Sequence, residues 1–248
     1  MLNKAIHFTK LSRTDYMSSV GSLFQTSTND EAIRSAVVDF GYNDERLDEG
    51  KTLYNQLDAL EREHDRVGGE KMKLVERKQL LQKSVAKAYM KYLKIARIAF
   101  AGHSQAMDVL LLEGTRERTY NKWFGQVMVF CNNLLEHKEY WPMMESYGVK
   151  ALHVEKLKND LNILSDLADQ CNKATAAIKQ LTQKKLKQTL KVQNWVSDYI
   201  KIARIALEDQ PQHLVKLGIM VRGEGKQSAA GRPKSERRNV NKINPATA

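Results

Sequence analysis

Tyr92-Leu93-Lys94-Ile95-Ala96-Arg97-Ile98-Ala99 returns later in the chain as Tyr199-Ile200-Lys201-Ile202-Ala203-Arg204-Ile205-Ala206, with seven of eight positions identical. The two segments lie 107 residues apart, and the match extends backward without a gap, so that residues 13–101 match residues 120–208. A long match at one fixed offset is the signature of an internal duplication. The sequence therefore predicts two tandem copies of a unit of about 107 residues.

The limits of the two copies follow from the residues after the shared segment. Gly114 matches Gly223 best, which predicts that the spacing slips by two residues directly after that segment. We expect one helical copy over residues 1–114, a second over 115–223 packed with it as one bundle, and a tail over 224–248.

Each copy is predicted to be helical. The first copy contains no proline, and apolar residues in both copies keep the alternating spacing of four and three that is typical of a helix seam. The seams are 81, 85, 88, 92, 95 and 99 in the first copy and 157, 161, 164, 168, 171 and 178 in the second. Shorter helices are expected over 12–25, 29–40, 104–113 and 212–221. The predicted fold class is all-α: a long antiparallel helical bundle or coiled coil with short flanking helices and a disordered basic C-terminal tail.

Two forms of the long helix are compatible with the pattern. One continuous helix in each copy would run over about 43–101 and 150–207, each roughly 85 Å long at 1.5 Å per residue. Alternatively, Gly68-Gly69 turns the first helix into a hairpin and the copies form a compact bundle. The matching residues, Thr175 and Ala176, carry no turn signal.

The charges favour an antiparallel arrangement of the long helices. Residues 30–70 hold twelve acidic residues and five Lys or Arg, whereas residues 171–197 hold six lysines and no acidic residue. Antiparallel helices place the acidic start of the first beside the basic end of the second. Exposed ion pairs contribute only about 0–1 kcal/mol each, so the charges set orientation more than stability.

The composition excludes several classes of protein. The chain has 248 residues, a formal net charge of +11, 13 Gly, 4 Pro and 2 Cys, which argues against a β-sandwich, a collagen-like chain and a disulfide framework. No apolar run approaches the roughly 18 residues that a membrane span needs. We expect a cytoplasmic protein.

The cations of the repeated segment are the first candidate site. Lys94, Arg97, Lys201 and Arg204 are not explained by an apolar seam. Either Arg97 and Arg204 reach a carboxylate across the bundle, or the four residues grip an anionic ligand or partner, for which the planar guanidinium is well suited.

Catalytic and metal sites are not predicted. Glu61 and His64 form a Glu-x-x-His, but the positions that match them hold Ala168 and Cys171, so the second motif of a di-iron bundle is missing. Cys131 lies among apolar residues and is predicted to be a core residue. We expect a non-enzymatic protein without cofactor, metal or small-molecule substrate.

Nucleic acid is the second candidate partner. Lys184, Lys187 and Lys191 fall on one stripe of the second long helix, where they serve either as a solvated face or as phosphate contacts. Residues 222–248 carry seven Lys or Arg against two Glu. Ala230-Gly231-Arg232-Pro233-Lys234 resembles the Gly-Arg-Pro core of an AT hook, which implies minor-groove contact by the tail, although Ala230 stands where that motif usually has Arg. The candidate nucleic-acid residues of the tail are Arg232, Lys234, Arg237 and Arg238.

The sequence supports one leading function and two alternatives. The duplication and the long seams favour a scaffold or adaptor that binds a protein partner or self-associates. The first alternative is a nucleic-acid-associated protein that uses the tail and the lysine stripe. The second, less favoured alternative is a membrane-surface or toxin-like helical rod.

Overall fold

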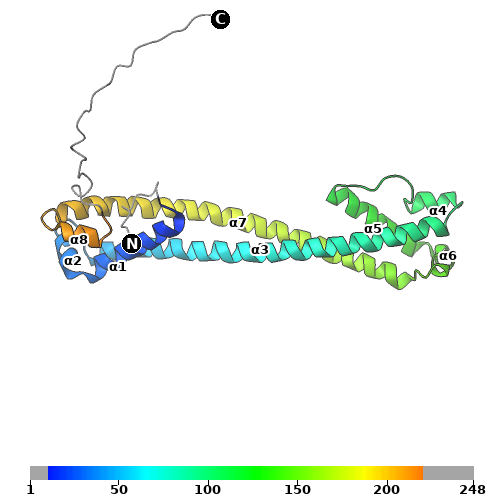
Figure 1. The fold of residues 1–248 in the computed structure, drawn as a ribbon, viewed down its shortest axis with the longest axis horizontal. Coiled ribbons are helices and arrows are strands. Elements are labelled where there is room, and N and C mark those ends of the chain that lie inside the picture. Colours follow the sequence, from blue (N-terminus) through cyan, green and yellow to red (C-terminus); the bar gives the residue numbers. More distant parts are fainter. Residues whose placement is uncertain (1–10, 220–248) are drawn as a thin grey trace, which may run out of the picture. The chain divides into compact units, whose positions relative to one another are not determined.

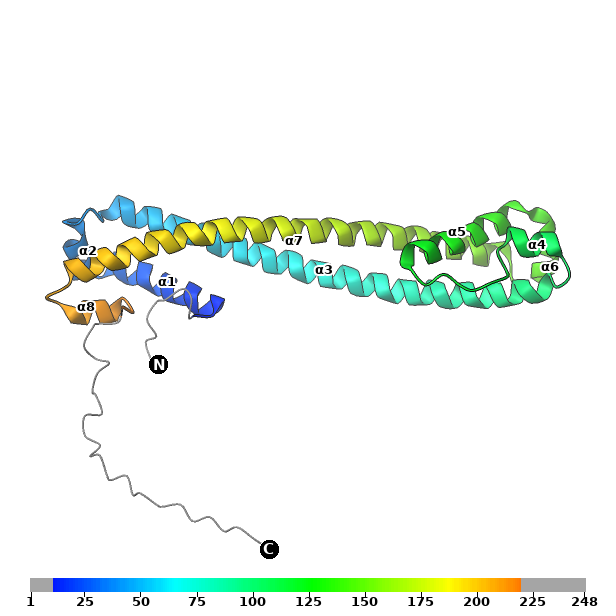
Figure 2. The same cartoon turned by 90° about the horizontal axis from the view of Figure 1, so that it is seen from above.

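The computed structural model describes residues 11–219 and confirms the all-α fold class (Figures 1 and 2). Within these residues there are eight α-helices, a single 3-10 helix and no strand. The elements in chain order are α1 (Arg13–Asn29), α2 (Glu31–Val38), α3 (Asp44–Ala99), α4 (Ser104–Val109), α5 (Tyr120–Glu136), η1 (Lys138–Tyr140), α6 (Trp141–Ser146), α7 (Ala151–Ala206) and α8 (Pro211–Lys216).

The helix bounds repeat at the offset found in the sequence. Helices α1, α3 and α4 reappear, shifted by 107 residues at both ends, as α5, α7 and α8. The short helix α2 corresponds to η1 followed by α6, where Pro142 lies in the first turn. A proline at that position costs no hydrogen bond because the first N–H groups of a helix have no partner within it.

The offset persists beyond the repeated segment, so the prediction of a slip directly after it is wrong. Leu111 and Gly218 both adopt positive φ, 51° and 73°. The N–H group of the next residue, Leu112 or Ile219, bonds back to the carbonyl of Met107 or Leu214. These left-handed residues end α4 at Val109 and α8 at Lys216, earlier than the predicted ends at 113 and 221.

Both long helices are continuous. Helix α3 runs through Gly68-Gly69 without a turn, so the hairpin alternative is wrong. Helices α3 and α7 each contain 56 residues. Within residues 11–219, no helix combines the length and the apolar character that crossing a membrane requires.

The chain divides into two compact units that cut across the two copies. Unit 1 holds residues up to 52 and from 193 onward, and unit 2 holds residues 53–192. Each unit therefore contains helices from both copies. The predicted copy boundaries at 114 and 223 stay a prediction.

Unit 1 is built around an aromatic cluster. The Trp195 ring lies 5.0 Å from the Phe24 ring and 5.3 Å from the Tyr199 ring, and Tyr42 packs edge-on against both Trp195 and Tyr199. Asp30 caps α2 through the N–H of Ile33, and its carboxylate accepts a hydrogen bond of 2.7 Å from the ammonium of Lys216, the last residue of α8. This bond lowers the pKa of Asp30.

Unit 2 has one hydrophobic core shared by α3, α4, α5, α6 and α7. Tyr89 packs edge-on against Phe130, and Phe100 packs edge-on against Tyr140. The fully buried residues that α3 gives to this core are Val85, Tyr89, Leu93 and Ala96, followed by Phe100 directly after the helix.

The predicted seam of α3 is displaced by one residue. Only position 85 of the predicted set is fully buried, while Leu81, Ala88, Tyr92, Ile95 and Ala99 pack at the edge of the core. A seam of fours and threes assumes one neighbouring helix. Here α5 and α7 both contribute to the core that α3 joins, so a wider face is covered and its centre moves.

Candidate functional site

The cations of the repeated segment are divided between the units. Lys94 and Arg97 belong to unit 2, whereas Lys201 and Arg204 belong to unit 1. Arg97 is half-buried, and its Nε donates to the backbone carbonyl of Leu112 at 2.6 Å. The expectation that Arg97 reaches a carboxylate is therefore wrong. The guanidinium of Arg97 instead bonds to the backbone of the segment that follows α4. Lys201 forms an exposed ion pair with Asp198 at 2.9 Å, and Lys94 is exposed.

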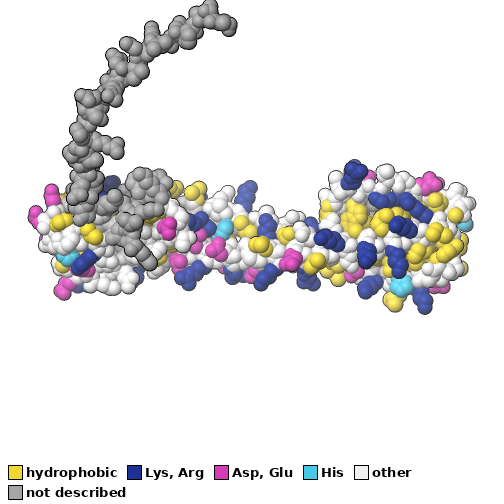
Figure 3. Space-filling view, viewed as in Figure 1, with side chains coloured by type: hydrophobic (Ala, Val, Ile, Leu, Met, Phe, Trp, Pro, Cys, Tyr) yellow, Lys and Arg dark blue, Asp and Glu magenta, His cyan; other side chains and the backbone are white. Residues whose placement is uncertain are grey.

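The lysine stripe of α7 is exposed and has leucines beside it. Lys184, Lys187 and Lys191 are exposed. Leu186 and Leu190 are 63% and 52% exposed. At 100° of rotation per residue they lie on the side of α7 opposite the buried Lys185 and Gln188. Figure 3 shows lysine and arginine side chains, with hydrophobic side chains among them, on the visible surface of the long helices in unit 2.

One lysine within this segment is buried. Lys185 is 4% exposed, and its ammonium lies 2.8 Å from a carboxylate oxygen of Glu61. Next to this pair, the side-chain amide of Gln188 donates to the backbone carbonyl of Leu53 at 2.9 Å. These contacts join α3 and α7 within unit 2 and confirm their antiparallel direction. Lys185 was not among the predicted site residues. The signal that could have found it is that the matching position of the first copy, Lys78, is also a lysine.

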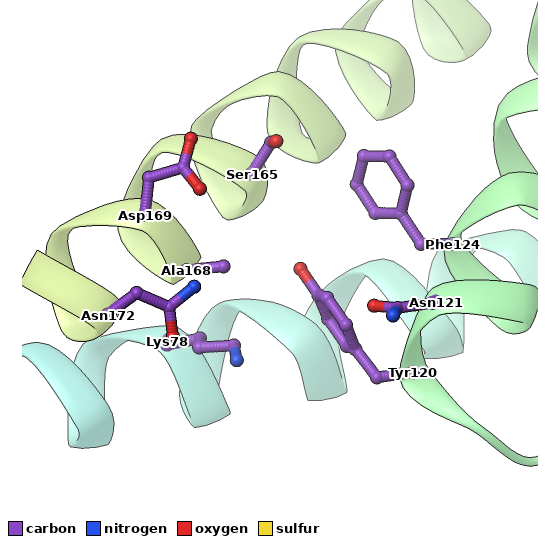
Figure 4. Close-up of a pocket in the computed structure, with 8 residues that line it drawn as sticks. All are labelled: Lys78, Tyr120, Asn121, Phe124, Ser165, Ala168, Asp169 and Asn172. Carbon is purple, nitrogen blue, oxygen red and sulfur yellow. The ribbon is translucent and has the colours of Figure 1, made fainter. Parts of the chain in front are cut away.

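Lys78, which matches Lys185 at the offset of 107 residues, lines a cavity in unit 2. The cavity measures about 420 Å³ and is lined by Lys78 from α3, by three residues at the start of α5 and by four residues of α7 (Figure 4). The α5 residues are Tyr120, Asn121 and Phe124, and the α7 residues are Ser165, Ala168, Asp169 and Asn172.

Lys78 and Tyr120 lie next to each other in the wall of the cavity. The Lys78 ammonium lies 4.4 Å from the centre of the Tyr120 ring. The Tyr120 hydroxyl points into the space between α5 and α7, and within residues 11–219 this buried oxygen has no hydrogen-bond partner (Figure 4). Burial and, second, the negative charge of Asp169 raise the pKa of Tyr120. The hydroxyl is therefore a neutral donor at physiological pH.

The remaining candidates have plain structural settings. Cys131 is fully buried in the core of unit 2, as predicted, and burial raises the pKa of its thiol to about 12. His64 lies 3.5 Å from the carboxylate of its neighbour Asp65. Over residues 11–219 no three His, Cys, Asp or Glu side chains are grouped so as to hold a metal ion. Arg232, Lys234, Arg237 and Arg238 lie outside the described residues.

The chain matches no protein-family model, no curated protein and no solved structure.

Proposed function

We propose that the protein is a non-enzymatic helical scaffold that binds an acidic amphipathic helix of a partner along α7. The observation that carries the proposal is the exposure of Leu186 and Leu190 beside three lysines. Leucines four residues apart form one stripe on a helix, and such a stripe is what a second helix packs against.

The charges define the partner. Lys184, Lys187 and Lys191 flank the leucines on one side, and the segment 171–197 contains no acidic residue. An incoming helix with leucines at spacings of three and four and glutamates beside them would bury the leucines and meet the ammonium groups. The leucines supply affinity, and the lysines favour this partner over basic helices.

The test uses a defined helix instead of a cell extract. A labelled synthetic peptide with leucines and glutamates in this pattern is titrated into the full chain, with a peptide of the same composition and scrambled order as control. Binding should be specific for the ordered peptide, and the double variant Leu186→Gln/Leu190→Gln should weaken it by roughly tenfold or more. Met72→Gln is the matched control, because Met72 is a 75% exposed apolar residue of α3 outside this stripe.

Two results would contradict the proposal. Equal binding of the ordered and scrambled peptides would show that charge alone is responsible. Concentration-dependent dimerisation in sedimentation experiments, lost in the same double variant, would assign the leucines to a second copy of the chain.

Nucleic acid remains the second candidate, favoured by the exposure of all three lysines of the stripe. In that case a labelled A·T-rich duplex would bind with a steep salt dependence, since each neutralised phosphate releases counterions. Binding that is unaffected by removal of residues 224–248 and by Lys184→Gln/Lys187→Gln/Lys191→Gln would exclude this candidate.

A further inference from the structure

The cavity stands at the position that an ion pair occupies elsewhere in unit 2. The duplication places Lys78 at the position equivalent to Lys185, and Ala168 at the position equivalent to Glu61. Lys185 pairs with Glu61 at 2.8 Å. Lys78 faces the same cavity as Ala168, which has no carboxylate to offer. Within residues 11–219, no carboxylate lies within 4.0 Å of the Lys78 ammonium.

The missing carboxylate at position 168 indicates that a ligand of this cavity carries a carboxylate. A lysine ammonium is attracted to the face of a tyrosine ring, and the equivalent lysine shows that the geometry between α3 and α7 accepts a carboxylate. A carboxylate brought by a ligand can therefore lie near Ala168 and take the place that the Glu61 carboxylate has beside Lys185. The Tyr120 hydroxyl points into the same space and can donate to that carboxylate.

The other walls define the rest of the ligand. Phe124 and the methyl group of Ala168 offer apolar surface, and Asp169 lies on the α7 side of the cavity. An ammonium group would be favoured near Asp169, whereas the second negative charge of a phosphate monoester would be repelled by it. The volume of about 420 Å³ falls within the range of small-molecule sites, about 300–1,000 Å³.

We propose that this cavity binds a free α-amino acid with an apolar side chain. Its carboxylate lies between Lys78 and the Tyr120 hydroxyl, its ammonium faces Asp169, and its side chain packs against Phe124. This site is separate in residues from the leucine stripe at 186 and 190, so its test does not depend on the proposed partner helix.

The experiment compares matched probes on the full chain. L-leucine and L-phenylalanine are measured against 3-methylbutylamine and 2-phenylethylamine, which lack only the carboxylate, by saturation-transfer NMR and calorimetry. Both amino acids should bind at millimolar concentration or below, and both amines should bind at least about tenfold more weakly.

Two variants locate the binding. Ala168→Glu restores the residue of the first copy, so its carboxylate should pair with Lys78 and abolish binding of the amino acids while the helical circular dichroism is unchanged. Lys78→Met should abolish binding by removing the cation. The control Lys83→Met removes an exposed lysine of α3 outside the cavity and should leave binding intact.

The proposal would be overturned by no binding of either amino acid, by equal binding of amino acids and amines, or by binding that survives both Ala168→Glu and Lys78→Met. Binding of inorganic phosphate as tightly as the amino acids would also overturn it, because the cavity would then be a general anion site.

Discussion

Gly50 lies directly against the indole ring of Trp195 in unit 1. A Cβ atom at position 50 would come within 2.5 Å of that ring and within 2.7 Å of the Phe24 ring. At the equivalent positions in unit 2 the sizes are exchanged, because Leu157 matches Gly50 and Ala88 matches Trp195. Leu157 is buried in the core of unit 2, and Ala88 is partly buried against the same core. In both units α7 therefore supplies the larger residue of the matched pair and α3 the smaller one.

Gly50→Ala should destabilise the protein strongly. The added methyl group has no room between Trp195 and Phe24, and overpacking of this kind costs about 3 kcal/mol. Urea unfolding followed by circular dichroism would measure the loss in free energy of unfolding. The double variant Gly50→Ala/Trp195→Phe, which opens space at the same contact, should recover part of it. An unchanged midpoint for Gly50→Ala would show that the ring moves aside freely.

Much of the fold could be predicted because the duplication constrains it. The repeated segment alone gives the offset that relates α1, α3 and α4 to α5, α7 and α8 at both ends. The absence of proline from the first copy indicates the long helix. The predicted buried positions of α3 were displaced by one residue. A spacing of fours and threes describes packing against one helix, whereas α3 packs into a core that several helices share. The predicted end of α4 was wrong because a leucine in the left-handed conformation, Leu111, carries no sequence signal. The end of α8 does carry a signal, since Gly218 is the residue type that commonly follows a helix in this conformation, but the prediction placed the end beyond it.

The candidate sites were less predictable than the fold. Arg97 was recognised as unusual, but its acceptor is a backbone carbonyl, which has no residue signature. The cavity was not predicted because its signal appears only when four residues are compared. Both copies keep the lysine, Lys78 and Lys185, but Glu61 of the first copy is replaced by Ala168 in the second. Comparing the two copies position by position for reciprocal or one-sided changes would have found both this difference and the Gly50–Trp195 contact.

Gly68→Ala should stabilise the protein. Both Gly68 and Gly69 lie inside α3, and a Cβ at either position meets nothing within 4 Å. Alanine in a helix interior is favoured over glycine by about 0.8–1.0 kcal/mol, so each substitution should raise the free energy of unfolding by about that amount. Urea unfolding of both single variants and the double variant checks additivity. A loss of stability would indicate that these glycines relieve a strain in the long helix.

Leu111→Gly should also stabilise the protein. Leu111 adopts φ of 51°, and the equivalent residue Gly218 shows that glycine suits the same turn at 73°. The left-handed conformation costs a residue with a side chain roughly 1–2 kcal/mol, and the partly exposed leucine loses little packing in compensation. The expected net gain is about 1 kcal/mol. The reverse change, Gly218→Leu, should lower the free energy of unfolding. Urea unfolding of both variants tests this, and a loss of stability in Leu111→Gly or a gain in Gly218→Leu would contradict the prediction.

Stability should fall at alkaline pH. Burial raises the pKa of Cys131 from 9.0 to about 12 and that of Tyr199 from 10.0 to about 12. Both groups are neutral when protonated, so the unfolded chain loses these protons first as the pH rises. Their contribution is fully present below about pH 9 and is lost progressively from there to about pH 12.

Urea midpoints measured between pH 7 and pH 10.5 test this dependence. The stability should be flat at the lower end and decline above pH 9. Cys131→Ala removes one of the two groups, so its decline should be shallower than that of the unchanged chain. A decline of equal slope in Cys131→Ala would show that other groups cause it.

Glu61→Ala should be among the most destabilising substitutions in unit 2. It removes the carboxylate 2.8 Å from the Lys185 ammonium, and the lysine side chain is only 5% exposed. A buried charge that loses its partner costs about 3–5 kcal/mol, whereas replacing both charges by apolar groups is often neutral. The double variant Glu61→Leu/Lys185→Met should therefore be more stable than Glu61→Ala by urea unfolding. If the two variants were equally unstable, the pair would contribute through its shape and not through its charge, and the equivalence between Glu61 and a ligand carboxylate at Ala168 would lose its physical basis.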